Sequence, residues 1–246
     1  MSVYFEMGSN IVPQTPHFDA MKTCDYLAFL RRAATRMLDF LVPESCVGCK
    51  AAGVVLCENC LRNIPPPAYA ESKDIISLFD YRNGTIRKAL WALKYRGGRR
   101  MGKILGVLMY AKVTKVVESG QIENNSNKAI LIPIPLSKKR LRERGFNQSE
   151  VLAEELSYRD QGKNFILETS VLYRARDTGS QALIKDRETR MNNVKGCFAV
   201  NNKNKILGKN IILIDDITTT GATLEEAKKV LVDNGAERVI AVTVGH

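Results

Sequence analysis

The chain has 246 residues, 45% of them apolar, and a formal net charge of +11. This length accommodates one sizeable core and a small appendage, and the composition is typical of a globular protein. No apolar run approaches the roughly 20 residues that span a bilayer, so no transmembrane segment is expected. The excess of positive charge favours anionic partners, either phosphates or nucleic acid, and composition does not separate the two.

The N-terminal region divides into two predicted segments. Residues 1–22 are predicted to form a flexible tail; they lack the basic start and apolar middle of a signal peptide, which favours a cytoplasmic location. Residues 23–42 show helical periodicity, with an apolar stripe and three arginines mostly outside it. Such a basic amphipathic helix either packs on a neighbouring domain or lies on a membrane surface.

Two C-x-x-C pairs follow, and seven residues separate them. Four thiolates at this spacing can surround one Zn²⁺ tetrahedrally. A thioredoxin-like redox pair and two disulfides are alternatives, although a redox pair needs only one C-x-x-C. Because protein would fill every coordination position, the zinc would be structural. We therefore predict a zinc-binding unit with a proline-rich linker at 43–67. Its ligands are Cys46, Cys49, Cys57 and Cys60.

The remaining residues, 68–246, alternate predicted strands and helices. Strands are expected at 75–81, 129–136, 211–214 and 239–244, and helices at 85–94, 103–117, 149–156 and 224–231. Residues 171–200 suggest a short strand, a long mobile loop or helix, and an edge strand. The last three main strands are continuous apolar runs, typical of parallel strands buried on both faces. The prediction is an α/β domain with a parallel sheet flanked by helices.

A basic segment from Ser137 to Gln148 follows the strand at 129–136 and is predicted as a loop. Five of the seven residues at 138–144 are basic. Basic runs are usually solvated faces. This one follows a buried strand, where the ligand crevices of open parallel sheets lie, and that position favours a role in binding an anion.

The most informative stretch is 211–224, in which an apolar strand ends on Asp215 and Asp216. A loop of threonine, glycine and alanine and then a helix follow. Loop N–H groups and hydroxyls at a helix N-terminus suit a phosphate. The two carboxylates can accept hydrogen bonds from a ribose diol or bind a hard divalent cation. An ordinary strand–helix unit with solvent-facing acids is the alternative.

This segment resembles the phosphoribosyl pyrophosphate (PRPP) motif of type I phosphoribosyltransferases: an apolar strand, two acids, and Thr-Thr-Gly-Ala-Thr. The resemblance implies that Asp215 and Asp216 hold the ribose hydroxyls of Mg²⁺-bound PRPP. It implies that the following loop holds the 5-phosphate. That loop consists of Thr218, Thr219, Thr220, Gly221, Ala222 and Thr223.

The resemblance extends over roughly 25–246. The paired C-x-x-C, Ile-Pro-Ile-Pro-Leu with Arg-Glu-Arg-Gly-Phe-Asn-Gln, Arg-Glu-Thr-Arg-Met-Asn-Asn-Val and the PRPP motif occur in that order. This arrangement resembles the ComF family of bacterial competence proteins. The family implies a type I phosphoribosyltransferase-like fold with an N-terminal zinc ribbon, and a role in natural transformation, where imported single-stranded DNA is handled in the cytoplasm.

The same resemblance assigns further residues. Arg142 and Arg144 would neutralise pyrophosphate, and Gln181, Arg187 and Arg190 would belong to a flexible loop that closes over PRPP. Two hypotheses stay open: a Mg²⁺-dependent transferase with an unidentified acceptor, or a binding protein that works with single-stranded DNA and competence or helicase proteins. A nucleotide-salvage or amido-type phosphoribosyltransferase without a DNA role is the alternative.

Overall fold

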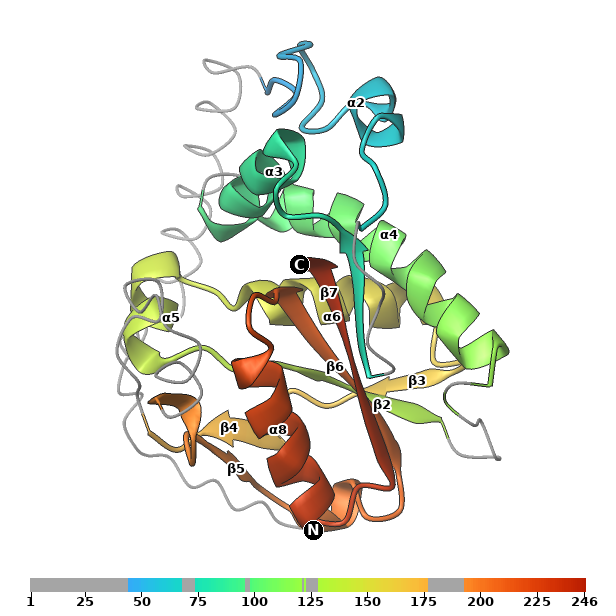
Figure 1. Cartoon of the computed structure of the whole chain (residues 1–246), viewed down its shortest axis with the longest axis vertical. Helices are drawn as coiled ribbons and strands as arrows, with labels where there is room; N and C mark the ends of the chain where they lie inside the picture. The colour runs from blue at the N-terminus through green and yellow to red at the C-terminus, as the bar shows by residue number, and fades with distance from the viewer. Residues whose placement is uncertain (1–43, 68–73, 96–97, 121, 123–127, 177–192) are drawn as a thin grey trace, which may run out of the picture. The chain divides into compact units, whose positions relative to one another are not determined.

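The computed structural model describes residues 44–67, 74–95, 98–120, 122, 128–176 and 193–246 (Figure 1). The tail predicted at 1–22 and the amphipathic helix predicted at 23–42 lie outside these residues. Residues 45–246 form one compact unit, which contains both the cysteine pairs and the sheet. No helix in the described ranges is both long and apolar enough to cross a membrane.

The secondary structure alternates as the sequence predicts. The helices are α2 (Glu58–Arg62), α3 (Gly84–Lys94), α4 (Gly98–Glu118), α5 (Lys138–Arg144), α6 (Gln148–Asp160) and α8 (Ala222–Asp233), with a 3-10 turn at Lys203–Lys205. The strands are β1 (Ile75–Phe79), β2 (Ala129–Pro133), β3 (Phe165–Leu167), β4 (Leu172–Arg174), β5 (Phe198–Val200), β6 (Asn210–Ile217) and β7 (Arg238–Gly245).

The predicted parallel sheet is confirmed. Its strand order is β1-β7-β6-β2-β3, and every neighbouring pair is parallel. Strands β2 and β6 lie side by side, but the chain continues from β2 toward β3 and from β6 toward β7. Their carboxyl ends therefore form a topological switch point, where open α/β sheets bind ligands. The short β4 and β5 pair separately in an antiparallel ladder.

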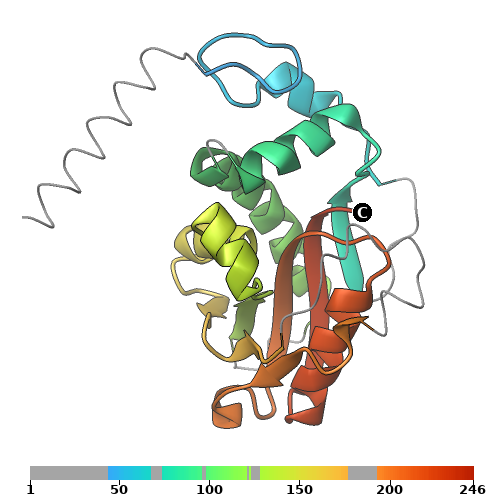
Figure 2. The ribbon, with the colours of Figure 1, turned by 90° about the vertical axis from the view of Figure 1, so that its left-hand side faces the viewer.

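Both faces of the sheet are buried, and the residues of each strand alternate between them. On β6, Ile212 and Ile214 pack with the helices α3, α4 and α6, whereas Ile211 and Leu213 pack on the α8 side. Figure 2 shows the green α3 and α4 on one side of the red strands and α8 on the other. This double burial explains why the strands are continuous apolar runs.

Helices α4 and α6 approach closely because α4 carries glycines at the contact. A Cβ on Gly102 would lie 2.5 Å from Val151 Cγ1, and one on Gly106 would lie 2.6 Å from Glu155 Cβ. Any side chain at these positions would force the helices apart. The two glycines thus hold α6 against the sheet, with its first residues beside the ends of β2 and β6.

Several local expectations differ from the structure: β6, for example, continues through Asp215 and Asp216 to Ile217, and α4 begins at Gly98. The basic segment predicted as a loop contains the helix α5, because the Ser137 hydroxyl caps it by accepting the Arg140 N–H at 3.3 Å and Gly145, at φ +78°, ends it. Strand β3 was not predicted, because three residues are too few to show a period.

Candidate functional site

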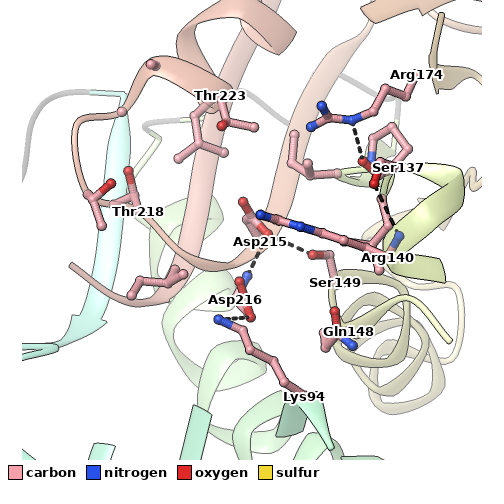
Figure 3. Close-up of a pocket in the computed structure, with 18 of the residues that line it drawn as sticks. Lys94, Ser137, Arg140, Gln148, Ser149, Arg174, Asp215, Asp216, Thr218 and Thr223 are labelled. Carbon is pink, nitrogen blue, oxygen red and sulfur yellow. Dashed lines mark hydrogen bonds and ion pairs between the residues drawn. The ribbon is translucent and has the colours of Figure 1, made fainter. Parts of the chain in front are cut away.

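A cavity opens at the carboxyl ends of β2 and β6. Its walls come from the end of β2, α5, the start of α6, the end of β6 and the start of α8, with one residue each from α3 and β4 (Figure 3). The cavity therefore lies at the topological switch point of the sheet. Residues 215–224 form one wall, and they include all eight residues that the PRPP motif predicts.

Asp215 and Asp216, here called the acid pair, are the last charged residues of β6. Asp215 Oδ1 accepts hydrogen bonds from Ser149 Oγ and from the Asp216 N–H, both at 2.8 Å. Asp216 Oδ2 lies 3.0 Å from the Lys94 ammonium. Burial, and next the charge of Asp216, raise the pKa of Asp215 to about 7, although Ser149 and Lys94 oppose the shift.

The segment between α5 and α6 positions Ser149 on the acid pair. Asn147 caps α6, since its Oδ1 accepts the Ser149 N–H at 3.2 Å. Its amide also donates to the carbonyl of Ile134 at 3.0 Å, which ties the start of α6 to the end of β2. Arg144 donates to Gln148 at 2.6 Å. The run Arg-Gly-Phe-Asn-Gln thus fixes one wall of the cavity.

The threonine loop, residues 218–223, crosses from β6 to α8. The Thr218 N–H donates to the carbonyl of Gly245 at 2.9 Å, which anchors the loop to the end of β7. Gly221 stands at φ +78° immediately before α8. A residue with a side chain is strained there, so glycine is required where the loop turns into the helix. Anions favour the N-terminus of a helix, and α8 directs this end at the cavity.

Four cationic side chains from the described part of the chain line the cavity: Lys94, Arg140, Arg144 and Arg174. Figure 3 shows Arg140 extending across the cavity toward Asp215. Arg174 Nε donates to the carbonyl of Pro135 at 3.4 Å, and its guanidinium lies 5.0 Å from the centre of the Phe198 ring. The cavity therefore combines two acids with several fixed positive charges, which suits a ligand that carries both hydroxyls and phosphates.

The two arginines predicted to bind pyrophosphate, Arg142 and Arg144, differ in their positions relative to the cavity. Arg144 lines the cavity, whereas Arg142 is exposed on α5 and is not among the lining residues. The predicted flexible-loop residues, Gln181, Arg187 and Arg190, lie outside the described residues.

The predicted site residues do not include Lys94, Arg140, Ser149 or Arg174, although Arg140 belongs to the basic segment that is expected to bind an anion. The sequence contains a helix-start signal near both Arg140 and Ser149. Ser137, three residues before Arg140, is a typical N-cap residue, and Asn147 is another, two residues before Ser149. Lys94 is one of several basic residues from 94 to 103 that could contact pyrophosphate or a DNA backbone, and Arg174 carries no local signal. Only the packing of α3 and β4 brings these two residues to the cavity.

The raised pKa of Asp215 predicts a pH effect on stability. The folded carboxyl titrates at about 7 and the ordinary value is 3.8, so the folded state binds the extra proton between these values. The free energy of unfolding should therefore fall as pH rises toward 7, by up to about 1.4 kcal/mol per pH unit, and level off above it. Urea unfolding from pH 5.5 to 8.5, compared with Asp215→Asn, measures this; parallel curves for the two proteins would contradict it.

The four cysteines Cys46, Cys49, Cys57 and Cys60, here called the cysteine cluster, lie together. Their sulfur atoms are all within 4.8 Å of one another, and Cys49 and Cys57 Sγ are 3.6 Å apart. Zn–S bonds of about 2.3 Å in a tetrahedron imply S–S edges of about 3.8 Å, so the cluster fits a Zn²⁺ ion. No pair is close enough for a disulfide, and all four are free thiols.

The surroundings of the cysteine cluster favour a cation between the sulfurs. Burial acts to raise the pKa of Cys46, but hydrogen bonds from the backbone of Cys57, Cys49 and Gly48 outweigh it and lower the pKa to about 6. A hydrogen bond with Cys57 raises the pKa of Cys60 to about 12. Without a cation, crowded thiols cannot all ionise; a metal removes that conflict.

Comparison with known proteins agrees with this geometry. A family model described as a phosphoribosyl transferase domain matches residues 143–245. "DNA utilization protein YhgH" of Escherichia coli (strain K12) is 26% identical over 183 residues, which are 74% of each chain. "Competence protein F" of Haemophilus influenzae is 26% identical over 184 residues, 74% of this chain and 75% of the relative. "Competence protein ComFC" of Bacillus subtilis (strain 168) is 40% identical over 106 residues, 43% of this chain but only 39% of the relative.

Among solved structures, a hypoxanthine phosphoribosyl transferase of Trypanosoma cruzi matches with a TM-score of 0.34 and 12% identity, over 58% of this chain and 63% of that one. The family match and the parallel sheet confirm the phosphoribosyltransferase-like fold. The relatives confirm the resemblance to ComF proteins. The chain is thus a homologue of competence protein F, ComFC and YhgH, and it contains a phosphoribosyl transferase domain.

Proposed function

We propose that the cavity binds a phosphoribosyl ligand such as PRPP together with Mg²⁺, and that the protein uses this site in DNA utilization in the cytoplasm. One observation supports this most: the acid pair, the threonine loop and four cationic side chains line a single cavity at the switch point. Diol acceptors, a phosphate cradle and cations for pyrophosphate are the groups that such a ligand needs.

The proposed arrangement assigns each part of the ligand. The acid pair accepts the ribose hydroxyls, and the threonine loop at the start of α8 holds the 5-phosphate. Arg140 and Arg144 on α5 neutralise the pyrophosphate, and Arg142 on the same helix stays a candidate for that role. Gln181, Arg187 and Arg190 remain proposed contacts of a loop that closes over the ligand.

The donor set fits Mg²⁺, which prefers carboxylate and phosphate oxygens. Asp216 Oδ2 is buried and, among the described residues, has the Lys94 ion pair but no hydrogen bond. Asp215 and Asp216 would be the residues that hold the cation. When bound, the cation supplies positive charge to the pyrophosphate.

If the site turns over, the protein's part is to position and to stabilise charge. Transfer of a phosphoribosyl group passes through an oxocarbenium-like sugar, so no side chain has to act as a nucleophile. The arginines of α5 stabilise the departing pyrophosphate, and the walls of the cavity hold the sugar in position. The geometry serves a binding protein equally well, because the same contacts retain an unreacted ligand.

The role in DNA utilization rests on the relatives. YhgH is named a DNA utilization protein and two other relatives are named competence proteins. We infer from them that the chain acts on single-stranded DNA with competence or helicase proteins, and that the cysteine cluster holds structural Zn²⁺. A salvage or amido-type transferase without a DNA role is the alternative, and it predicts a purine or amine acceptor.

Thermal unfolding of the zinc-loaded protein with and without Mg²⁺–PRPP tests the site. Ligand at about 100 times its dissociation constant should stabilise the protein by about 2.7 kcal/mol, or roughly 5 to 10 °C at this chain length. Pyrophosphate release is assayed in the same samples. A shift with release supports a transferase, a shift without release supports a binding protein, and no shift refutes the site.

A further inference from the structure

The outer face of α3 carries a basic and aromatic stripe. Arg87, Lys88, Trp91 and Tyr95, here called the α3 stripe, are all exposed, while Ile86, Ala89, Leu90 and Leu93 are buried. At 100° per residue Arg87, Lys88 and Trp91 fall within an arc of about 100°, so they share one face, and Tyr95, the residue that caps the end of α3, places its ring beside Trp91. That face points away from the core, so packing in the core does not account for the two large aromatic side chains on it.

The two rings form one surface. Trp91 is 62% exposed and Tyr95 is 54% exposed, and their centroids are 5.0 Å apart with the planes tilted by 43°. Large aromatic side chains are usually buried, so two adjacent exposed rings mark a binding surface rather than ordinary packing. Flat π-faces suit partners that stack.

The segment of the chain that carries these rings has charged residues of one sign. Between residues 84 and 117, which include α3 and nearly all of α4, the chain carries nine lysines and arginines and no acidic residue. Helices α3 and α4 pack against each other (Figure 1), and Arg99 and Arg100 in the first turn of α4 extend the basic region that begins on α3. Such a region attracts a polyanion and repels other basic surfaces. A polyanion that also offers flat rings is a nucleic acid with unpaired bases.

We propose that the α3 stripe binds single-stranded DNA, with bases stacked on Trp91 and Tyr95 and phosphates contacted by Arg87 and Lys88. Stacking on exposed aromatics beside cations is how single strands are bound without sequence preference. The choice of DNA over RNA rests on the proposed function; the single-stranded character rests on the stripe itself. The last residue of α3, Lys94, reaches the acid pair, so DNA would lie next to the cavity.

Another exposed aromatic shows why this surface is selected. Tyr158 on α6 is more exposed, at 76%, but it lines a groove of mixed charge, in which Glu154 and Glu155 lie with Arg99, Lys103 and Arg159. The Glu155 carboxylate pairs with Arg159 at 2.9 Å. Tyr158 therefore serves as a control: an exposed ring in a setting where acidic and basic side chains are mixed.

The chain provides its own probe, because Trp91 is its only tryptophan. Titrating the full-length, zinc-loaded protein with oligothymidylate at low salt should quench the tryptophan fluorescence, since a stacked base contacts the indole directly. Heparin, a polyanion without bases, should bind without comparable quenching. Binding without quenching by oligothymidylate would overturn the stacking role of Trp91.

Variants then test each part of the α3 stripe by anisotropy of a labelled oligonucleotide. Trp91→Ala should weaken binding about tenfold, Trp91→Phe should restore most of it, and Tyr158→Ala should leave it unchanged. Arg87→Ala with Lys88→Ala should reduce the slope of log K against log salt by about 1.4, which is two single-strand phosphate contacts. All variants should keep the thermal shift with Mg²⁺–PRPP.

The outcomes separate this inference from the proposed function. If the double variant Trp91→Ala with Tyr95→Ala binds oligothymidylate as tightly as the native protein does, the α3 stripe is not the DNA-binding surface. A DNA role for the protein would remain. If the native protein does not bind DNA, both the α3 stripe and the DNA role are overturned. The PRPP site is tested separately, by the thermal shift with Mg²⁺–PRPP. Quenching that grows with protein concentration in the absence of DNA would show contact between two copies instead.

Discussion

Replacement of Asp215 and Asp216 together by asparagine should abolish binding of Mg²⁺–PRPP and leave the protein folded. Both carboxylates line the cavity, and within the described ranges Asp216 Oδ2 has an ion pair with Lys94 but no hydrogen bond, so a ligand diol or cation has carboxylate oxygens to use. Asparagine keeps the shape but presents an N–H₂ group to the ligand in place of an oxygen. We expect affinity to fall at least 100-fold, about 2.8 kcal/mol.

Calorimetric titration with Mg²⁺–PRPP measures this directly. The matched control is Asp233→Asn with Glu237→Gln, which removes the exposed carboxylates of the last residue of α8 and of the residue before β7. The control changes the formal charge as much as the double variant does, but it should bind as the native protein does because neither residue lines the cavity. Folding is checked by thermal unfolding without ligand. Similar affinities for the double variant and its control would refute the role of the acid pair.

Loss of the metal from the cysteine cluster should cost several kcal/mol of stability. Zinc binding to small peptides with four such ligands is worth about 10–16 kcal/mol in apparent free energy, and much of it is folding free energy. Cys46 is fully buried in the same core as α3 and α4, and its Sγ accepts the Cys57 N–H at 3.3 Å. Cys46→Ser should therefore lose the Zn²⁺ ion, because it removes a buried thiolate ligand.

Metal content and thermal unfolding, with and without a chelator, test this prediction. The native protein should hold one Zn²⁺ per chain, and chelation should lower its unfolding temperature to that of Cys46→Ser. Cys197→Ala is the control, since Cys197 is also buried but lies among residues on the α8 side of the sheet. Its pKa is raised mainly by burial. A native protein that contains no metal would contradict the zinc site. So would cysteines that are oxidised and do not react with a thiol reagent.

The cysteine cluster is also joined to the rest of the unit. A Cβ on Gly48 would lie 2.6 Å from Cys60 Sγ and 3.4 Å from Thr85 Cγ2, so the first C-x-x-C packs between the second pair and the first turn of α3. In Figure 1, α3 lies between this region and the carboxyl ends of β6 and β7. The same helix thus contacts the cysteine cluster at one end and the acid pair, through Lys94, at the other.

Several features followed from the amino-acid sequence alone, and each depends on neighbours along the chain. The β6–loop–α8 unit was predicted because an apolar run, two acids, the threonine loop and the start of a helix follow one another within residues 211–224. The two C-x-x-C pairs likewise placed four thiols together, as the structure confirms. Strand and helix periods, caps and ligand spacings are local properties, so a single sequence reports them.

Other features were decided only by tertiary structure. Lys94 meets Asp216, Ser149 meets Asp215, and Arg174 enters the same cavity, although these residues come from separate elements. The pairing of β2 with β6 and the glycine contacts between α4 and α6 bring them there. Crossover connections and side-chain packing set which elements become neighbours, and no local pattern encodes that choice. The sequence thus determined the chemistry of the β6–α8 wall, and the fold determined which cations face it.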